Sequence, residues 1–288
     1  MDTTTTSDGR MDRRTFLGAG ALAAAAALAG CTVRGVPAGE TSRRRDWTFP
    51  AAEVDVVRVD SDVGDVTVVG RETDTVDVTA VARSWNGQRG LDRVDVTATV
   101  REGTLTVVST VDGGPVDTPR TPRADVTVVV PAGTGGPDVD TVRTGAGEVT
   151  LTDTRGDTAV EAVAGAIVAN RVDGYLSLRA SAGRIEAADV TGLDEARTDL
   201  GRVQVELLGA RGDVEISSGM GEVVVGVADD LDLDVLAEAE GRVSSDLDLT
   251  GGRARRDRVE GRLNDGGHRL HAVSEAGRVA LRRIERRM

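Results

Sequence analysis

Residues that could do metal or acid–base chemistry are few in this sequence. The two histidines, His268 and His271, are three positions apart, and on a β-strand this spacing directs them to opposite faces. A zinc site needs three or four converging ligands, and no nucleophile-elbow motif accompanies the histidines. We therefore expect no catalytic residue, no metal site and no cofactor, and we predict that the protein is not an enzyme.

Calcium requires separate consideration, because glycines recur every nine residues here, as they do in β-rolls that bind this ion. Those proteins repeat the turn G-G-x-G-x-D, so that backbone carbonyls and aspartates converge on the ion. Each turn of this chain has one glycine, and Asp157 and Asp213 are followed by no second ligand in a matching place. The sequence favours loose condensation of cations on acidic faces over a specific calcium site.

The first 30 residues are typical of an export signal. Twin arginines, Arg13 and Arg14, stand close before Phe16 and Leu17, and an apolar stretch follows at 19–29. That stretch is shorter than the about 20 residues that cross a bilayer as a helix. The arrangement resembles the twin-arginine signal, which exports proteins in the folded state.

A lipid anchor is predicted directly after this signal. The sequence L-A-G-C at 28–31 resembles a lipobox, and Cys31, the only cysteine in the chain, would become the lipidated first residue of the mature protein. The alternative is a cleaved signal with an incidental cysteine. One or two acyl chains would hold the protein on a membrane without spanning it. We therefore predict an exported protein that is lipid-anchored at the extracellular face of the cell membrane.

The charge composition points to a salt-adapted archaeon. The chain has 48 acidic and 35 basic residues, a net charge of -13, and every basic residue is arginine. An acidic surface stays hydrated in concentrated salt, where charges are screened over a few ångströms. A GC-rich genome would explain the missing lysine but not the excess of acid. The acidic balance also argues against binding to nucleic acid.

An internal repeat indicates the fold. Apolar residues stand two and four positions after most of the repeat glycines, and the turns before alternate glycines differ in composition. Two nine-residue units would therefore make one coil of about 18 residues. The predicted fold is all-β, a β-solenoid with two short strands per coil. The structural turns of this repeat are placed at Gly147, Gly156, Gly165, Gly174, Gly183, Gly192, Gly201, Gly221 and Gly241.

Four regions follow from these patterns. Residues 1–30 are the signal peptide, 31–48 a flexible tether without periodicity, 49–140 an N-terminal β region, and 141–288 the glycine-punctuated solenoid. Strands are predicted in the N-terminal region at 54–59, 64–68, 76–81, 94–100, 103–108 and 126–130. We expect these strands to cap the first coil, because an uncapped end exposes an unpaired strand edge.

Several segments resemble one family. The run A-D-V-T-V-V-V-P-A-G at 124–133, M-G-E-V-V-V-G-V at 220–227 and S-E-A-G-R-V-A-L at 274–281 are similar to the bacterial and archaeal putative-adhesin family known as domain of unknown function 4097. The resemblance covers roughly residues 50 to 285. It implies a protein of repeated β-strands, usually associated with the cell envelope, and it supplies no catalytic residue.

Function is predicted from the outer surface. We expect a non-enzymatic, structural or adhesin-like protein of the cell surface, whose partner is an envelope protein or a surface glycan. The alternative is a β-helix protein that binds or cleaves envelope polysaccharide, although the mature chain has only four aromatic residues for a sugar platform. Charged residues that follow repeat glycines would form a ladder that stabilises adjacent coils or serves as a ligand track, namely Glu148, Arg184, Arg202, Glu222 and Arg242.

The last 38 residues have the opposite charge to the rest. Eleven arginines and five acids lie in 251–288, a local charge of +6. These arginines could neutralise nearby acidic faces, or they could dock the protein on an acidic envelope protein or anionic lipid.

Overall fold

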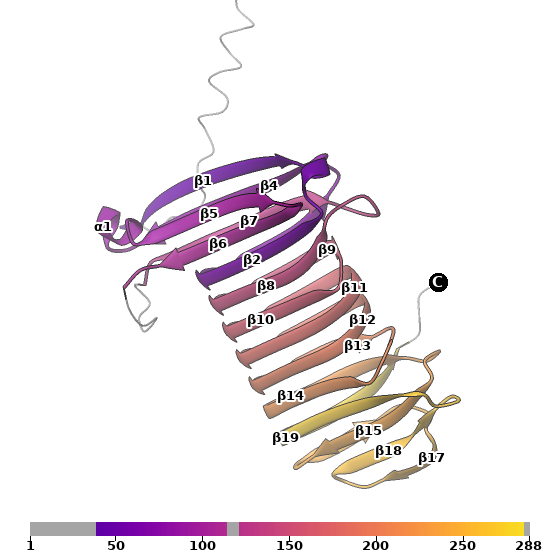
Figure 1. Cartoon of the computed structure of the whole chain (residues 1–288). Coiled ribbons are helices and arrows are strands. Elements are labelled where there is room, and N and C mark those ends of the chain that lie inside the picture. Colours follow the sequence, from indigo (N-terminus) through magenta and orange to yellow (C-terminus); the bar gives the residue numbers. More distant parts are fainter. Residues whose placement is uncertain (1–38, 114–120, 285–288) are drawn as a thin grey trace, which may run out of the picture. The chain divides into compact units, whose positions relative to one another are not determined.

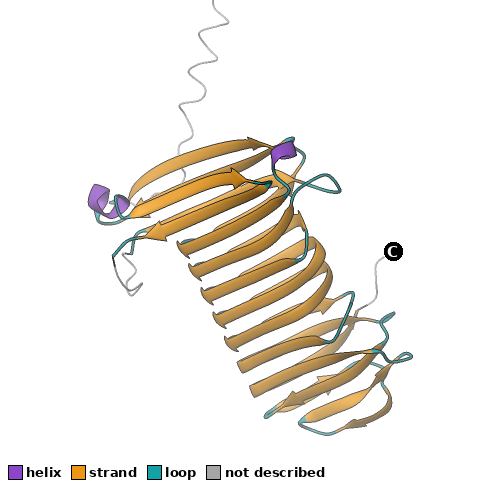
Figure 2. Cartoon of the chain, in the orientation of Figure 1, coloured by secondary structure: helices purple, strands orange, loops and turns teal. Residues whose placement is uncertain are grey.

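The computed structural model describes residues 39–113 and 121–284. The predicted twin-arginine motif and Cys31 lie outside the described residues. From Gly39 onward the chain forms one compact unit that is almost entirely β-structure (Figure 1, Figure 2), with the 3₁₀ helix η1 (Ala51–Glu53) and the short helix α1 (Gly87–Leu91) as its helical elements. The prediction of an all-β fold is confirmed. None of the helices in this described part is long and apolar enough to span a membrane.

The described strands all belong to one hydrogen-bonded sheet. In chain order they are β1 (Thr41–Pro50), β2 (Val56–Val63), β3 (Val66–Arg71), β4 (Thr75–Ser84), β5 (Val94–Arg101), β6 (Thr104–Val111), β7 (Arg123–Pro131), β8 (Asp138–Ala146), β9 (Val149–Arg155), β10 (Thr158–Ala164), β11 (Ile167–Ala182), β12 (Ile185–Leu200), β13 (Val203–Leu207), β14 (Val214–Ala228), β15 (Leu233–Ala239), β16 (Arg242–Ser245), β17 (Thr250–Ala254), β18 (Arg258–Leu263) and β19 (His268–Ile284).

Strands in the middle of the chain pair in parallel with partners 18 residues away. Val149 on β9 pairs with Ile167 on β11, and Ile167 pairs with Ile185 on β12. The second half of β11 joins a separate ladder, in which Leu176 pairs with Thr158 on β10 and β10 pairs with β8. Each long strand therefore contributes its first half to one ladder of strands and its second half to the other.

Alternate residues of both ladders fill a single apolar core. The inward side chains are almost all valine, leucine, isoleucine and alanine, and Ile167, Leu176 and Leu178 are completely buried. β-Branched residues suit this arrangement because they pack well on a pleated surface. A core therefore forms with few aromatic residues.

The N-terminal strands extend the two ladders and then end them. β2 and β3 pair in parallel with β8 and β9, while β6 and β7 pair in parallel with the other edges of β2 and β3. Antiparallel strands complete the end: β5 on β6, β4 on β7, and β1 on β4. All six strands expected in this region are present, with bounds that differ by a few residues.

β1 corrects the predicted tether. Residues 41–48, assigned to it from the sequence, lie in this strand and pair with β4 along its whole length. Trp47 and Phe49 pack against the core from β1. Arg43 and Arg45 on the same strand donate hydrogen bonds to main-chain carbonyls of the β5 region, with distances of 2.7 Å to Val94 and 3.0 Å to Val96. These contacts satisfy acceptors on β5 that would otherwise form an open edge.

The C-terminal strands do not stack in chain order. β14 pairs in parallel with β19 over nearly its full length, and β19 pairs on its other side with β15 and β16. The last described strand thus lies between β14 and the strands that follow β14 in sequence (Figure 1). β15, β18 and β17 then pair antiparallel at this end. Sequence spacing alone places Gly241 after Gly221, but Gly277 stands between them.

Candidate interaction surfaces

The repeat glycines divide between two corners of the stacked strands. Five of the predicted turns share one corner and have φ between 145° and 156°, namely Gly147, Gly165, Gly183, Gly201 and Gly221. Gly156, Gly174 and Gly192 lie at the other corner, where a Cβ on Gly174 would approach the Gly156 carbonyl oxygen to 2.1 Å. Gly241 donates a hydrogen bond to the carbonyl of Gly277 at 3.1 Å. These glycines therefore serve close backbone stacking and leave the outer faces to other residues.

A row of buried hydroxyls, which was not predicted from the sequence, lies three residues before the glycines of the first corner. Several of these hydroxyls donate to the carbonyl of the glycine in the preceding layer, as Thr198 does to Gly183 at 3.2 Å and Ser218 to Gly201 at 2.8 Å. Ser274 donates to Gly221 at 2.7 Å. The signal was present as Ser or Thr at a fixed distance before glycine, but alanine at 162 and 180 interrupts it.

Replacing Ser218 by alanine should therefore cost stability. We expect Ser218→Ala to lower the free energy of unfolding by about 1 kcal/mol, the typical value of one buried hydrogen bond. Ser61→Ala is the matched control, because Ser61 is equally buried in the same row but its hydroxyl has no hydrogen-bond partner among the described residues. Urea unfolding of both variants measures the difference, and equal losses would show that the Ser218 bond contributes nothing.

The predicted charge ladder exists and is largely paired with itself. Glu148 pairs with Arg184 at 3.1 Å, and Glu222 pairs with Arg202 at 2.8 Å and with Arg278 of β19 at 2.6 Å. Arg242 forms no ion pair with the described residues. Most of these side chains are half exposed, so each pair adds little stability. The ladder joins layers of strands and leaves few free charges for a ligand track.

Glu222 is the most enclosed member of this ladder, with a side chain 18% exposed. The hydrogen bond from Arg278 lowers the pKa of Glu222 from its ordinary value of 4.5, and the charges of Arg278 and Arg202 act in the same direction against the effect of burial. A carboxylate with a lowered pKa stabilises the folded state above the ordinary value and loses that contribution as the pH falls through its folded-state pKa.

Glu222→Gln should therefore destabilise the protein at pH 7 and have a progressively smaller effect as the pH falls below 4.5. The control is Glu186→Gln, which removes one exposed ion pair with Arg184. Urea unfolding at pH 7 and at several acidic pH values measures the stability difference from wild type. A difference for Glu222→Gln that is independent of pH would contradict this account.

The second corner carries an aromatic residue stacked with a cation. Arg211 lies over the ring of Tyr175, 4.4 Å from its centroid, and forms ion pairs with Asp157 and Asp194. The backbone N–H of Tyr175 and the guanidinium of Arg211 both lower the pKa of Asp157. Asp157 therefore accepts hydrogen bonds from two protein partners, the N–H of Tyr175 and the guanidinium of Arg211.

The histidines lie on β19 but do not form a site together. His268 is exposed, whereas His271 is half-buried and its Nε2 lies 3.3 Å from a carboxylate oxygen of Glu238. Within 39–113 and 121–284, no group of three or more His, Cys, Asp or Glu side chains is arranged to hold a metal ion.

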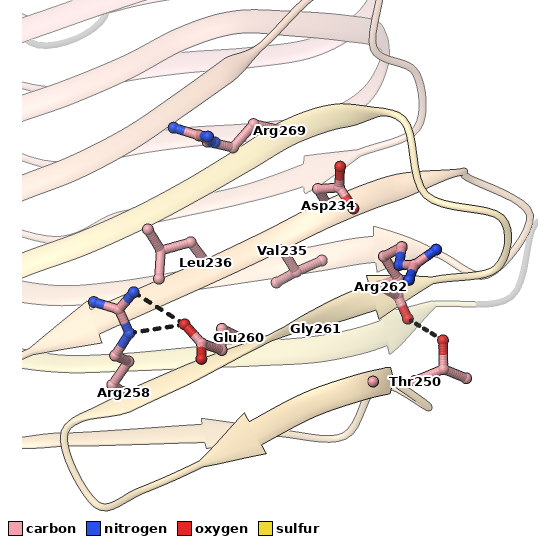
Figure 3. A pocket seen from close by; sticks show the side chains of 10 residues that line it. Asp234, Val235, Leu236, Thr250, Arg258, Glu260, Gly261, Arg262 and Arg269 are labelled. Atoms are coloured by element: carbon pink, nitrogen blue, oxygen red, sulfur yellow. Dashed lines mark hydrogen bonds and ion pairs between the residues drawn. The ribbon is translucent and has the colours of Figure 1, made fainter.

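Three of the shallow depressions on the surface of the described unit have volumes of about 510 to 570 Å³. One, of about 510 Å³, is lined from β15, β17, β18 and β19 (Figure 3). A second, of about 570 Å³, contains Arg197, Glu215 and His271. The third, of about 560 Å³, is lined by Arg58 and Asp140, which pair with each other at 2.6 Å, and by Asp173. The depression lined from β15, β17, β18 and β19 combines charged side chains with an apolar floor. Of its arginines, Arg258 is ion-paired, whereas Arg262 and Arg269 form no ion pair with the described residues.

Comparison with known proteins finds similarity only at the level of structure. No family model matches the chain, and no curated protein matches it. A putative cell adhesion protein from Clostridium sporogenes ATCC 15579 is 10% identical, with 85% of this chain and 100% of that chain covered and a TM-score of 0.37. A putative adhesin from Bacteroides fragilis NCTC 9343 is 12% identical, with 87% and 100% covered and a TM-score of 0.38. A putative lipid binding protein from Parabacteroides distasonis ATCC 8503 is 11% identical, with 85% and 97% covered and a TM-score of 0.41.

Proposed function

We propose that the protein is an exported, lipid-anchored β-solenoid that acts at the extracellular face of the cell membrane as a non-enzymatic, adhesin-like interaction protein. The observation that carries this proposal is the parallel stacking at an 18-residue offset, which repeats the same side-chain positions along two outer faces. Such a surface offers a partner many similar contacts.

The winding of the chain is the first part of the proposal. Parallel strands pair here between residues that are 18 positions apart. The chain must therefore form one strand in the first ladder, turn, form a strand in the second ladder, and return to the first ladder one layer further on. The hydrogen bond from the N–H of Gly165 to the carbonyl of Ala182 and the close approach of Gly165 to Gly147 support this path. A coil of about 18 residues with two strands accounts for these contacts.

Export and anchoring are the second part. Arg13, Arg14, Phe16 and Leu17 supply the signal, and Cys31 supplies the lipidation site. In this proposal residues 31–38 connect the lipid to the described fold, which begins at Gly39.

Replacing Cys31 by serine should release the protein from the cell. In the native host we expect the wild-type chain in the membrane fraction, accessible to protease added outside, and the Cys31→Ser chain in the medium. An Arg13→Lys and Arg14→Lys double variant should remain inside the cell. Quantitative immunoblotting of the three fractions measures this distribution. Retention of Cys31→Ser on the membrane would overturn the lipid anchor, and wild-type protein inside the cell would overturn export.

The interaction role has its own test. Cells that carry the wild-type protein should attach to surfaces coated with purified envelope material better than cells that lack the gene. Complementation with the wild-type gene should restore attachment, and complementation with Cys31→Ser should not. Hydrolysis of envelope polysaccharide by the purified protein would overturn the non-enzymatic role.

A further inference from the structure

Unpaired arginines concentrate at the C-terminal end of the strand stack. In the body of the stack most arginines face a carboxylate, as Arg143 faces Glu161 at 2.9 Å and Arg171 faces Asp153 at 2.6 Å. Six exposed arginines at the C-terminal end form neither an ion pair nor a side-chain hydrogen bond with the described residues: Arg242, Arg253, Arg255, Arg256, Arg262 and Arg269. Guanidinium groups left open in this way are available to an external anion.

Two of these arginines flank the depression on the outer face of β15, β17, β18 and β19 (Figure 3). Strand register places Arg262 opposite Asp234 and Asp234 opposite Arg269, so the three side chains form one row. No ion pair links Asp234 to either arginine in the described part of the chain. The row therefore presents two cations and one acceptor side by side.

The neighbouring side chains give this depression a fixed form. Arg258 is held by ion pairs with Glu238 and Glu260, the second at 3.0 Å. Leu236 lines the depression as a half-buried apolar side chain, and Gly261 beside it adds no side chain. The floor is consequently small and partly apolar between polar walls, and the volume of about 510 Å³ is within the usual range for small-ligand sites.

We propose that this depression binds the acidic sugar units of an anionic polysaccharide, with a carboxylate or sulfate group held by Arg262 and Arg269. A guanidinium offers two parallel N–H donors that match such groups. Asp234, Glu260 and Thr250 are placed to accept hydrogen bonds from sugar hydroxyls, and Leu236 and Gly261 provide room for a ring. Arg253 and Arg255 continue the basic surface beyond the depression, which suits a polymer more than a single sugar.

Charge favours this end over the rest of the protein as the site for a polyanion. Residues 229–288, which contain β15 to β19, carry 12 arginines and 13 acids, a net charge of -1, and because the whole chain carries -13, the remaining residues carry -12. A polyanion is therefore repelled less at this end than by the acidic body, and the unpaired arginines are the cations that it can meet there.

The distance of the depression from the N-terminal strand favours a glycan over a lipid surface as its ligand. This argument rests on the proposed function, in which the N-terminus is anchored in the membrane. One ladder runs from β1 to β16 through ten strand spacings, which is about 48 Å at 4.8 Å each. The eight residues 31–38 can span at most about 29 Å, even if fully extended. The arginines thus lie far from the strand at which an anchored chain enters the fold.

The test is a binding titration with the purified full-length chain. The probe is a fluorescent oligogalacturonate, with neutral dextran as a competitor control, and the readout is fluorescence anisotropy at several salt concentrations. The variant is Arg262→Gln with Arg269→Gln. Its matched control is Arg71→Gln with Arg101→Gln, which removes the same charge from two exposed arginines without ion pairs in the described N-terminal strands. Unchanged thermal unfolding of both variants verifies their folding.

We expect the Arg262 and Arg269 variant to bind at least tenfold more weakly and the control to change less than twofold. Equal losses in both variants would mean diffuse attraction and would overturn the site, as would failure of the wild-type chain to bind. Binding to anionic phospholipid vesicles without binding to the oligogalacturonate would identify a lipid surface instead. Concentration-dependent self-association that the Arg262 and Arg269 variant abolishes would identify a second copy. The titration uses purified protein and does not depend on export or anchoring. A negative result would therefore overturn the binding site alone, and the proposed function would still be tested by the fractionation and attachment experiments.

Discussion

Gly165→Ala is expected to disrupt the stack of strands with a loss of more than about 3 kcal/mol in the free energy of unfolding. A Cβ on Gly165 would lie 1.9 Å from the carbonyl oxygen of Gly147, and that oxygen is main chain, which cannot swing aside. The residue also has a φ of 145°, a conformation that residues with a side chain rarely adopt. Both effects act at once, so the layers on either side would have to separate.

The control for this substitution is Gly212→Ala. A Cβ at Gly212 would meet no atom within 4 Å, and its φ is outside the left-handed region. We expect its free energy of unfolding to change by less than about 0.5 kcal/mol, as for an ordinary surface substitution. Urea unfolding monitored by circular dichroism measures both variants. If Gly165→Ala proved as stable as Gly212→Ala, the close stacking of glycine on glycine would be disproved.

The sequence predicted those features of the fold that are local and periodic. Apolar residues two and four positions after a glycine alternate in and out on a strand, and their recurrence predicted the partners Val149, Ile167, Ile185 and Val203, which pair in succession. The N-terminal strands were predictable for the same reason. Each of them is a short alternating run bounded by turn residues.

Features that depend on a choice between distant strands were not predictable. The edge of β14 could accept either β16, the next strand with the repeat pattern, or β19. β19 is one unbroken strand whose apolar residues match both halves of β14, whereas the alternative is divided into β15 and β16 at Glu240 and Gly241. No local pattern reports this competition. The pairing of β1 with β4 was missed for a similar reason, because a lone strand rich in arginine has no recognisable core face until its partner is known.

The candidate binding surface was predicted only in part. The charge ladder follows from residues adjacent to regular glycines. Ion pairs form within it, but Glu148 and Arg184 are 36 residues apart and pair across the layer that carries Ala166, so the choice of partners was not predicted. The excess of arginine near the C-terminus was visible in composition. Its arrangement was not, because the row of Arg262, Asp234 and Arg269 depends on the antiparallel register of β15 with β18. One residue of slip would turn these side chains to the other face.

The position of β19 leads to the second large effect, which we expect from Val279→Asp. Val279 is 1% exposed and lies between Val223 of β14 and Val243 of β16. An aspartate there would place an unpaired charge in the core, at a cost of several kcal/mol. Val243→Asp is the matched control, because Val243 is 7% exposed and lies on the last strand paired in this ladder, beyond which its N–H bonds to the carbonyl of Arg256 outside any strand. Its carboxylate can reach water more readily, so we expect a smaller loss.

The two variants distinguish the observed strand order from stacking in chain order. If β16 followed β14 directly and β19 were outermost, Val243 would be the enclosed residue and Val279 the peripheral one, and the larger loss would move to Val243→Asp. Urea unfolding of the full-length chain gives both values in one experiment. The order of the two losses is informative even if both variants are poorly stable, because the comparison depends on their difference. We expect the larger loss for Val279→Asp. The ion pair of Arg278 with Glu222 at 2.6 Å supports the same strand order, because this contact forms only when β19 lies against β14.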